Sequence, residues 1–233
     1  MCVIIHQWKG KRNVTYKEFS NAWSANPHWF GLMTFVDGRV CVDKAMKLQD
    51  AWEIYSSYAE EVGWQENMVL HFRMATHWSI NRSNTHPFHC GNGKYLVHNG
   101  VLGYTSKKPW EEDMSDTRLL AQALEKFDSN PNDNWLDNDV VTDMVHKICS
   151  WGKVVVMDTN GDVWFFGAKG LMSSDGELWA STNAPFSSYS YCSYANEGDL
   201  LDEEWFWDDG VYTTYKEYCE EIGIPYNPDE IYY

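Results

Sequence analysis

The sequence predicts an α+β fold, and three observations carry this prediction. Short apolar runs bounded by turn residues are typical of strands, and they open the chain and return after its middle. Amphipathic stretches with helical spacing lie between these groups instead of following every strand, which favours antiparallel sheets over a doubly wound parallel sheet. The chain has 233 residues, of which 44% are hydrophobic, and this is enough for one packed domain.

The expected strands are recognised by alternating or continuous apolar residues. Two pairs of them form hairpins, because Asp37-Gly38 and Asn160-Gly161 tolerate the positive φ angles that tight turns need. The full set of expected strands covers residues 2–6, 31–36, 39–43, 68–74, 94–98, 153–158, 162–166 and 177–181.

Helices are expected where apolar residues recur at helical spacing. They cover residues 15–25, 44–62, a stretch that begins after Ser115, and 139–149. At the start of the first helix, Thr15 and Glu18 match a capping box. Ser115 is the expected cap of the third helix, whose predicted shared face consists of Leu119, Leu120, Ala123 and Phe127.

The charge balance is strongly acidic. Eighteen basic and 34 acidic residues give a formal net charge of −16, which disfavours binding to nucleic acid or to an anionic membrane surface. Residues 195–233 alone hold twelve acids and one base. We therefore expect residues 1–190 to form the folded domain and residues 191–233 to form an acidic, aromatic-rich extension.

The chain shows no sign of export. Its first residues do not resemble a secretory signal, and no apolar stretch approaches the about 20 residues that span a bilayer. The six cysteines include no C-x-x-C pair. We expect a cytoplasmic protein whose cysteines are thiols rather than disulfides.

Cys2 is the first residue that suggests chemistry. Removal of Met1 would place its thiol beside a free α-amine, which titrates at about 7.7 to 8.0 and so accepts a proton near neutral pH. Such an amine can take the proton of the nucleophilic thiol and later return it to a leaving amine. The structural alternative is a second-position cysteine that packs as a small hydrophobic residue.

Further motifs place polar side chains at the ends of expected elements. Strand 68–74 runs into Arg73-Met74-Ala75-Thr76-His77, whose guanidinium matches a carboxylate. Asn99-Gly100 follows strand 94–98, and an amide N–H beside a closely approaching backbone N–H can form an oxyanion hole. Asp116 begins a helix and offers a carboxylate that can hold an ammonium group.

The order and spacing of these motifs resemble the class II glutamine amidotransferases of the N-terminal nucleophile (Ntn) hydrolase superfamily. The resemblance rests on the N-terminal Cys, R-x-A-T-H at 73–77, N-x-H-P-F at 84–88, H-N-G at 98–100 and S-D-T at 115–117. It covers Cys2 to about residue 127 and continues more faintly to Leu178–Asn183. The chain departs from the family pattern at Val3 and Trp78, where glycine is usual.

The resemblance implies a four-layer αββα sandwich of two antiparallel sheets with helices outside, in which the Cys2 strand is central. It implies hydrolysis of the side-chain amide of glutamine, or of a γ-glutamyl amide, through a thioester and without a cofactor. The implied catalytic residues are Cys2 as nucleophile and Asn99 and Gly100 as oxyanion hole. The implied substrate-binding residues are Arg73 for the α-carboxylate, Asp116 for the α-ammonium group, and Thr76 and His77 around them.

Several alternatives stay open. The released ammonia passes to a separate synthase protein, or the chain is a free-standing glutaminase or γ-glutamyl amide hydrolase. A hypothesis of another class is a catalytically silent interaction protein that keeps the fold and binds a basic partner through its acidic tail. We expect no metal site, because His86, His89 and Cys90 lack further ligands at a regular spacing.

Overall fold

The described part of the chain forms two large antiparallel sheets and a short two-stranded one. The computed structural model describes residues 2–74, 84–102, 114–128, 130, 132–149 and 151–187, and the backbone of two short strands at 206–208 and 211–213. The first sheet has the order β3-β2-β4-β1-β10-β9 and the second the order β5-β6-β7-β8. Strands of the first are β1 (Val3–Gln7), β2 (Trp29–Val36), β3 (Arg39–Ala45), β4 (Met68–Arg73), β9 (Leu171–Met172) and β10 (Leu178–Ala180); those of the second are β5 (Phe88–His89), β6 (Tyr95–Asn99), β7 (Lys153–Met157) and β8 (Val163–Gly167).

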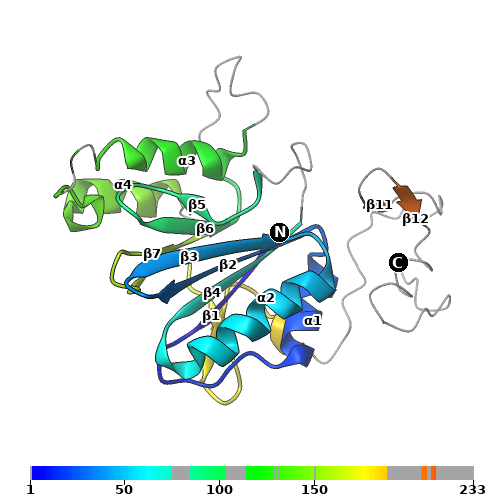
Figure 1. Cartoon of the computed structure of the whole chain (residues 1–233). Coiled ribbons are helices and arrows are strands. Elements are labelled where there is room, and N and C mark those ends of the chain that lie inside the picture. Colours follow the sequence, from blue (N-terminus) through cyan, green and yellow to red (C-terminus); the bar gives the residue numbers. More distant parts are fainter. Residues whose placement is uncertain are drawn as a thin grey trace.

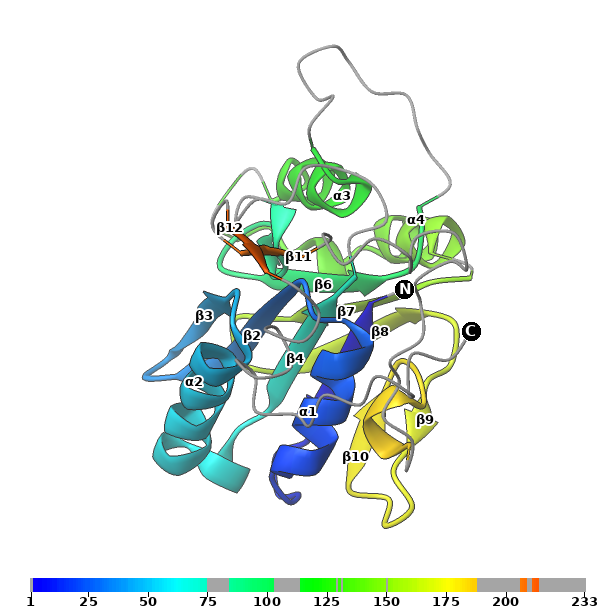
Figure 2. The same cartoon turned by 90° about the vertical axis from the view of Figure 1, so that its right-hand side faces the viewer.

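Helices cover the outer face of each sheet, so the molecule has four layers (Figure 1). Helices α1 (Tyr16–Ala25) and α2 (Leu48–Glu61) lie against the first sheet, and α3 (Asp116–Glu125) and α4 (Asp139–Ile148) lie against the second. The view turned by 90° shows the two sheets stacked between these helix pairs (Figure 2). This arrangement confirms the predicted αββα sandwich, and β1 is central in its sheet as expected.

The strands alternate between two apolar layers, as strand geometry requires. In β1, Val3 and Ile5 face the helices of the first sheet, whereas Ile4 faces the second sheet. The residues buried between the two sheets are Ile4, Met33, Val69, Val97, Val155 and Met157. A side chain two residues before or after one of these therefore points into the space between the sheets.

All expected strands and helices are present, with two corrections. Helix α2 begins at Leu48 rather than at residue 44, because β3 keeps its pairing with β2 as far as Ala45. The buried face of α3 differs from the predicted one: Phe127 follows the helix and is exposed, whereas the face turned to the sheet consists of Thr117, Leu120, Ala121 and Leu124.

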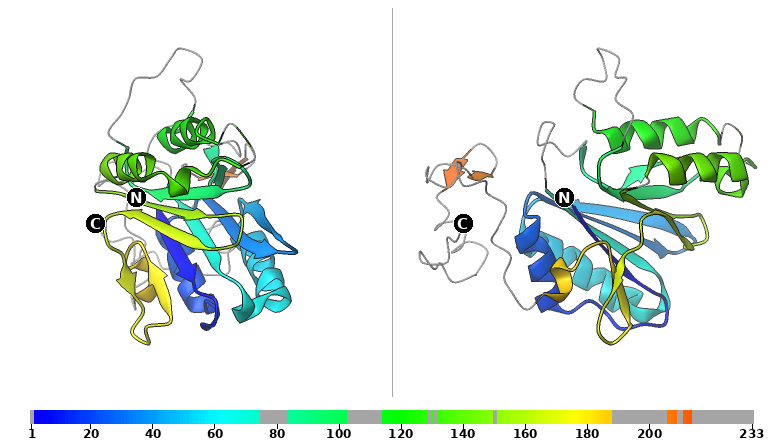
Figure 3. Two further views of the ribbon diagram at one scale, coloured as in Figure 1. Left: turned by 90° about the vertical axis from the view of Figure 1, so that its left-hand side faces the viewer. Right: turned by 180° about the vertical axis from the view of Figure 1, so that it is seen from behind.

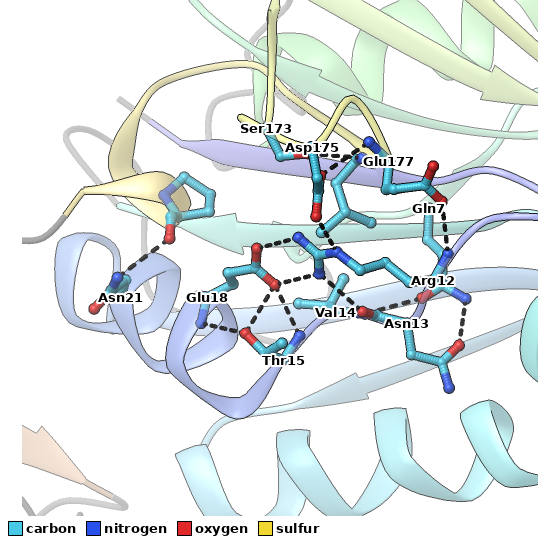
Figure 4. Close-up of polar contacts among 12 residues, drawn as sticks. Gln7, Arg12, Asn13, Val14, Thr15, Glu18, Asn21, Ser173, Asp175 and Glu177 are labelled. Atoms are coloured by element: carbon cyan, nitrogen blue, oxygen red, sulfur yellow. Dashed lines mark hydrogen bonds and ion pairs between the residues drawn. The ribbon is translucent and has the colours of Figure 1, made fainter.

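An ion-pair network fixes the start of α1 against the turn before β10 (Figure 4). Arg12 donates to both carboxylate oxygens of Glu18 at 2.8 and 2.7 Å, and its Nε donates to Asp175 at 2.6 Å. Glu18 also completes the predicted capping box with Thr15. The network therefore joins the segment after β1 to the loop that delivers β10 to the edge of β1.

The remaining elements are short. Among the described residues, 3-10 helices cover Gly63–Gln65, Trp135–Asp137 and Ala184–Phe186, and β11 (Phe206–Asp208) pairs with β12 (Val211–Thr213). The domain division at residues 190 and 191 stays a prediction.

The view from behind shows β9, β10 and the Ala184–Phe186 turn beside α1 (Figure 3, right). No helix in the described ranges is long and apolar enough to cross a membrane.

Candidate functional site

The ends of β1 and β4 place Cys2 and Arg73 side by side. Val3 pairs with Phe72 in the antiparallel register, so the next position along β1 toward its start, Cys2, lies beside Arg73. Cys2 shares the side-chain face of Ile4, and Arg73 shares that of Val69, so both are on the face turned to the second sheet. Cys2 is half-buried and its thiol is free.

The Cys2 thiol lies in a mixed electrostatic environment. Burial raises its pKa, while a hydrogen bond from the Met74 backbone N–H and the positive charge of Arg73 act in the opposite direction. The carboxylate of Asp116 is also near enough to raise the pKa of the thiol. Burial prevails, so the sulfur is a thiol at neutral pH and needs a base to become a nucleophile.

The Arg73 side chain is held by two contacts and is almost fully buried. Its side chain lies over the ring of its cross-strand neighbour Trp29, with the guanidinium carbon 5.0 Å from the ring centroid, and its Nη1 donates to the carbonyl of Asn84 at 2.9 Å. Only 5% of Arg73 is exposed. Burial lowers the pKa of Arg73, and the nearby Cys2 and Asp116 oppose this change. A buried, oriented guanidinium is suited to an incoming carboxylate.

Asp116 lies at the first turn of α3, where backbone groups orient its carboxylate. Oδ2 accepts from the Leu102 N–H at 2.9 Å, and Oδ1 accepts from the Thr117 N–H at 2.7 Å. Asn84 connects this helix start to Arg73, because its Oδ1 accepts from the Ser115 N–H at 3.1 Å. The positive and negative side chains of the site are thus held in one hydrogen-bonded frame.

Asn99 ends β6 and faces the first sheet. Its Nδ2 lies 2.8 Å from Ser181 Oγ, which also accepts from the Ile4 N–H at 2.8 Å. Gly100 has φ of +144°, and a Cβ there would meet Gly152 Cα at 2.7 Å, so only glycine fits. The Asn99-Gly100 turn is therefore fixed from two sides, by Ser181 through its side chain and by Gly152 through its backbone.

Three buried histidines lie beneath the site and join the two sheets. His71 of β4 donates from Nε2 to the His98 carbonyl of β6 at 3.1 Å, and the same nitrogen lies 2.7 Å from His86 Nδ1. His98 Nδ1 lies 3.0 Å from Thr117 Oγ1 in α3. Burial lowers the pKa of His71 to about 3 and of His98 to about 4, so both are neutral.

The structure brings most of the predicted site residues to one end of the sandwich. Cys2, Arg73 and Asp116 interact electrostatically, and Asn99 is tied by Ser181 to the strand that carries Cys2. Thr76 and His77 lie outside the described residues. In the ranges that the structure describes, no group of three histidine, cysteine or carboxylate side chains is arranged to hold a metal ion. His86 is buried against His71, whereas His89 is exposed beside Glu125.

Three residues of the site were not predicted from the sequence. Trp29 supports the Arg73 guanidinium, Asn84 connects Arg73 to the start of α3, and Ser181 contacts Asn99. Asn84 and Ser181 do lie within the motifs N-x-H-P-F and L-W-A-S-T-N that carried the resemblance. Their order along the chain was a signal, but their contacts depend on strand pairing across the whole domain.

No family model and no curated protein matches the chain. Among solved structures, the chain is similar to the glutamine phosphoribosylpyrophosphate (PRPP) amidotransferase from B. subtilis in complex with ADP and GMP, with 17% sequence identity and a TM-score of 0.48. The match covers 80% of this chain and 43% of that one, so the chain spans less than half the length of the protein it matches.

Proposed function

We propose that the chain is an Ntn-type amidohydrolase that cleaves the side-chain amide of glutamine or of a γ-glutamyl amide. The observation that carries this proposal is one thiol, Cys2, flanked by the fixed positive charge of Arg73 and the negative charge of Asp116. A glutamyl head group carries one α-carboxylate and one α-ammonium group, so the two fixed charges complement both of its charges. The side-chain amide of such a substrate extends from this head toward the sulfur.

The reaction begins once removal of Met1 has freed the α-amine of Cys2. The amine takes the thiol proton as the sulfur bonds to the amide carbon, and the carbonyl electron pair moves onto oxygen. The Asn99 side-chain N–H and the Gly100 N–H stabilise this oxyanion. When the oxyanion collapses, the C–N bond breaks and the leaving nitrogen takes the proton from the amine, which leaves a γ-glutamyl thioester.

Water completes the cycle. The α-amine takes a proton from the attacking water, the hydroxyl bonds to the thioester carbon, and the C–S bond breaks. Glutamate leaves and the sulfur recovers the proton. The ammonia or amine of the first step is free to leave, and the proposed acceptor is a separate synthase protein. In its absence the chain acts as a glutaminase or γ-glutamyl amide hydrolase.

The test compares glutamine with a γ-glutamyl amide of an aromatic amine, and measures release of ammonia or amine after intact-mass analysis has shown loss of Met1. Cys2→Ala is expected to abolish release, whereas Cys41→Ala, which changes another half-buried free cysteine, is expected to keep it. Release from the γ-glutamyl amide alone would remove glutamine as the substrate. Retention of Met1 together with no release from either compound would return the chain to the interaction-protein hypothesis.

The oxyanion role has its own test. Asn99→Asp sets a carboxylate against the developing negative charge, so kcat is expected to fall by at least about 10² to 10³, the loss seen when one such donor is removed. A purely structural Asn99 would instead lower the stability of the variant, because the new carboxylate would be buried beside Ser181, so the melting temperature is measured together with kcat. If the variant has the melting temperature of the parent and keeps kcat within about threefold of it, Asn99 is not part of the oxyanion hole.

A further inference from the structure

Ser181 lies where three strands of two sheets meet. It follows β10 directly, and its backbone N–H donates to the Ile4 carbonyl at 2.9 Å, which continues the pairing of β10 with β1. Its Oγ accepts from the Ile4 N–H and lies 2.8 Å from the side-chain amide of Asn99 in β6. Ser181 and Asn99 are each 4% exposed, and Ile4 is fully buried. One hydroxyl thus connects the nucleophile strand to the proposed oxyanion residue.

The hydrogen-bonding capacity of these groups decides which end of the Asn99 amide faces Ser181. With Nδ2 toward Ser181, the serine oxygen accepts twice, and among the described residues its own proton has no acceptor and the buried Asn99 Oδ1 has no donor. With Oδ1 toward Ser181, the hydroxyl accepts from Ile4 and donates to Asn99, so its capacity is used. The nitrogen and oxygen of an amide are exchanged by a simple turn about χ2.

We infer that Ser181 is a positioning residue for the oxyanion hole: it accepts from the Ile4 N–H, donates to Asn99 Oδ1, and thereby leaves Asn99 Nδ2 free to donate to the substrate. This inference rests on the proposed function for its chemical consequence. The other end of the amide is buried without a partner in the described residues, and an unpartnered buried donor is costly unless a ligand uses it. An unpartnered oxygen there would instead repel a developing oxyanion.

The hydrogen bonds of Ser181 also connect the proposed oxyanion hole to the nucleophile Cys2. Ile4 is two residues from Cys2 on the same face of β1, so the bond from Ile4 to Ser181 and the bond from Ser181 to Asn99 set the spacing between sulfur and hole. Preorganised donors stabilise a transition state because they need no reorientation when charge develops. Loss of the hydroxyl should therefore reduce kcat and leave binding of the substrate head group, and so KM, nearly unchanged.

A neutron structure of the deuterated chain tests the placement without reference to activity. We expect the Ser181 deuteron to point at Asn99 Oδ1 and both Nδ2 deuterons to point away from Ser181. Nδ2 deuterons directed at Ser181 would overturn the inference. This reading is independent of the proposed function, which fails separately if the parent releases nothing from glutamine and from γ-glutamyl amides.

Kinetics in a mutant cycle test the coupling. Ser181→Ala is expected to lower kcat by about tenfold and to keep KM within about twofold of the parent. In an Asn99→Ala background, the same substitution should change kcat by less than about twofold, because the Ser181–Asn99 hydrogen bond is already lost. Ser173→Ala is the matched control, since Ser173 Oγ also accepts a buried backbone N–H, that of Leu178 in β10, at 3.0 Å. Equal fold-losses for Ser181→Ala in both backgrounds, or an equal loss for Ser173→Ala, would reduce Ser181 to a structural residue.

Discussion

Acid should destabilise this fold through its buried histidines, and His6 allows a clean test because it lies away from the proposed site. His6 is 1% exposed, packs against the rings of Trp8 and Phe165, and has its Nε2 3.2 Å from Asn67 Oδ1. Burial lowers the pKa of His6 to about 3. As pH falls, the unfolded chain binds this proton first, near its ordinary pKa of about 6.5.

The magnitude follows from these two values. The contribution of His6 to folding is complete above about pH 6.5 and is lost progressively as pH falls from there to about 3. Between pH 7 and pH 5 the loss is about 2 kcal/mol, since each pH unit below the unfolded pKa costs about 1.4 kcal/mol. Paired carboxylates contribute little in this window, because their ordinary pKa values are about 3.9 to 4.3.

The assay is urea unfolding at pH 7 and pH 5 for the parent and two variants. His6→Gln keeps an N–H that can donate to Asn67 but cannot take up a proton, so its stability difference between the two pH values should be about 2 kcal/mol smaller than that of the parent. His89→Gln, at an exposed histidine, should change this difference little. An unchanged pH difference in His6→Gln would refute the assignment of acid sensitivity to burial of His6.

Three further changes test separate parts of the structure. Arg73→Ala should lower kcat/KM for the amide by roughly tenfold to a hundredfold, because a charge-assisted contact to the substrate carboxylate is lost, while Cys2 stays reactive toward a small alkylating agent; unchanged kinetics would place the carboxylate elsewhere. Gly100→Ala should lower the melting temperature much more than Gly10→Ala, since both have positive φ but Gly10 has open space around its Cβ position; equal shifts would contradict the close contact with Gly152. Thr15→Ala should reduce the free energy of unfolding by about 1 kcal/mol in urea unfolding, through loss of the capping box, and no change would show that the cap is replaced by water.

Local signals predicted the elements of the fold well. The Asp37-Gly38 turn has positive φ at both residues, at 50° and 78°, as its sequence indicates, and Thr15 caps α1 as its spacing with Glu18 predicts. The predicted start of α2 was wrong, because helical spacing over 44–62 competes with the pairing of β3 with β2, and this pairing prevails through Ala45. Helical periodicity alone could not choose the buried face of α3 either, since Leu119 and Leu120 satisfy more than one stripe.

Residues of the site could be predicted from the sequence only where they stand out within the ordered motifs. Cys2, Arg73, Asn99 and Asp116 stand out because each carries a functional group at the edge of an element. Ser181 carries an ordinary hydroxyl within a short strand segment, and its contact with Asn99 spans 82 positions of the chain. Such a contact depends on which strands become neighbours, and no local pattern specifies that.

The pairing of β1 with β10 has a consequence for the timing of synthesis. The Ile4 N–H and Ser181 Oγ are 177 positions apart, and β10 lies next to β1 in the sheet. On the ribosome, the first strand therefore emerges long before its neighbour exists, and its edge stays open while roughly three quarters of the chain is made.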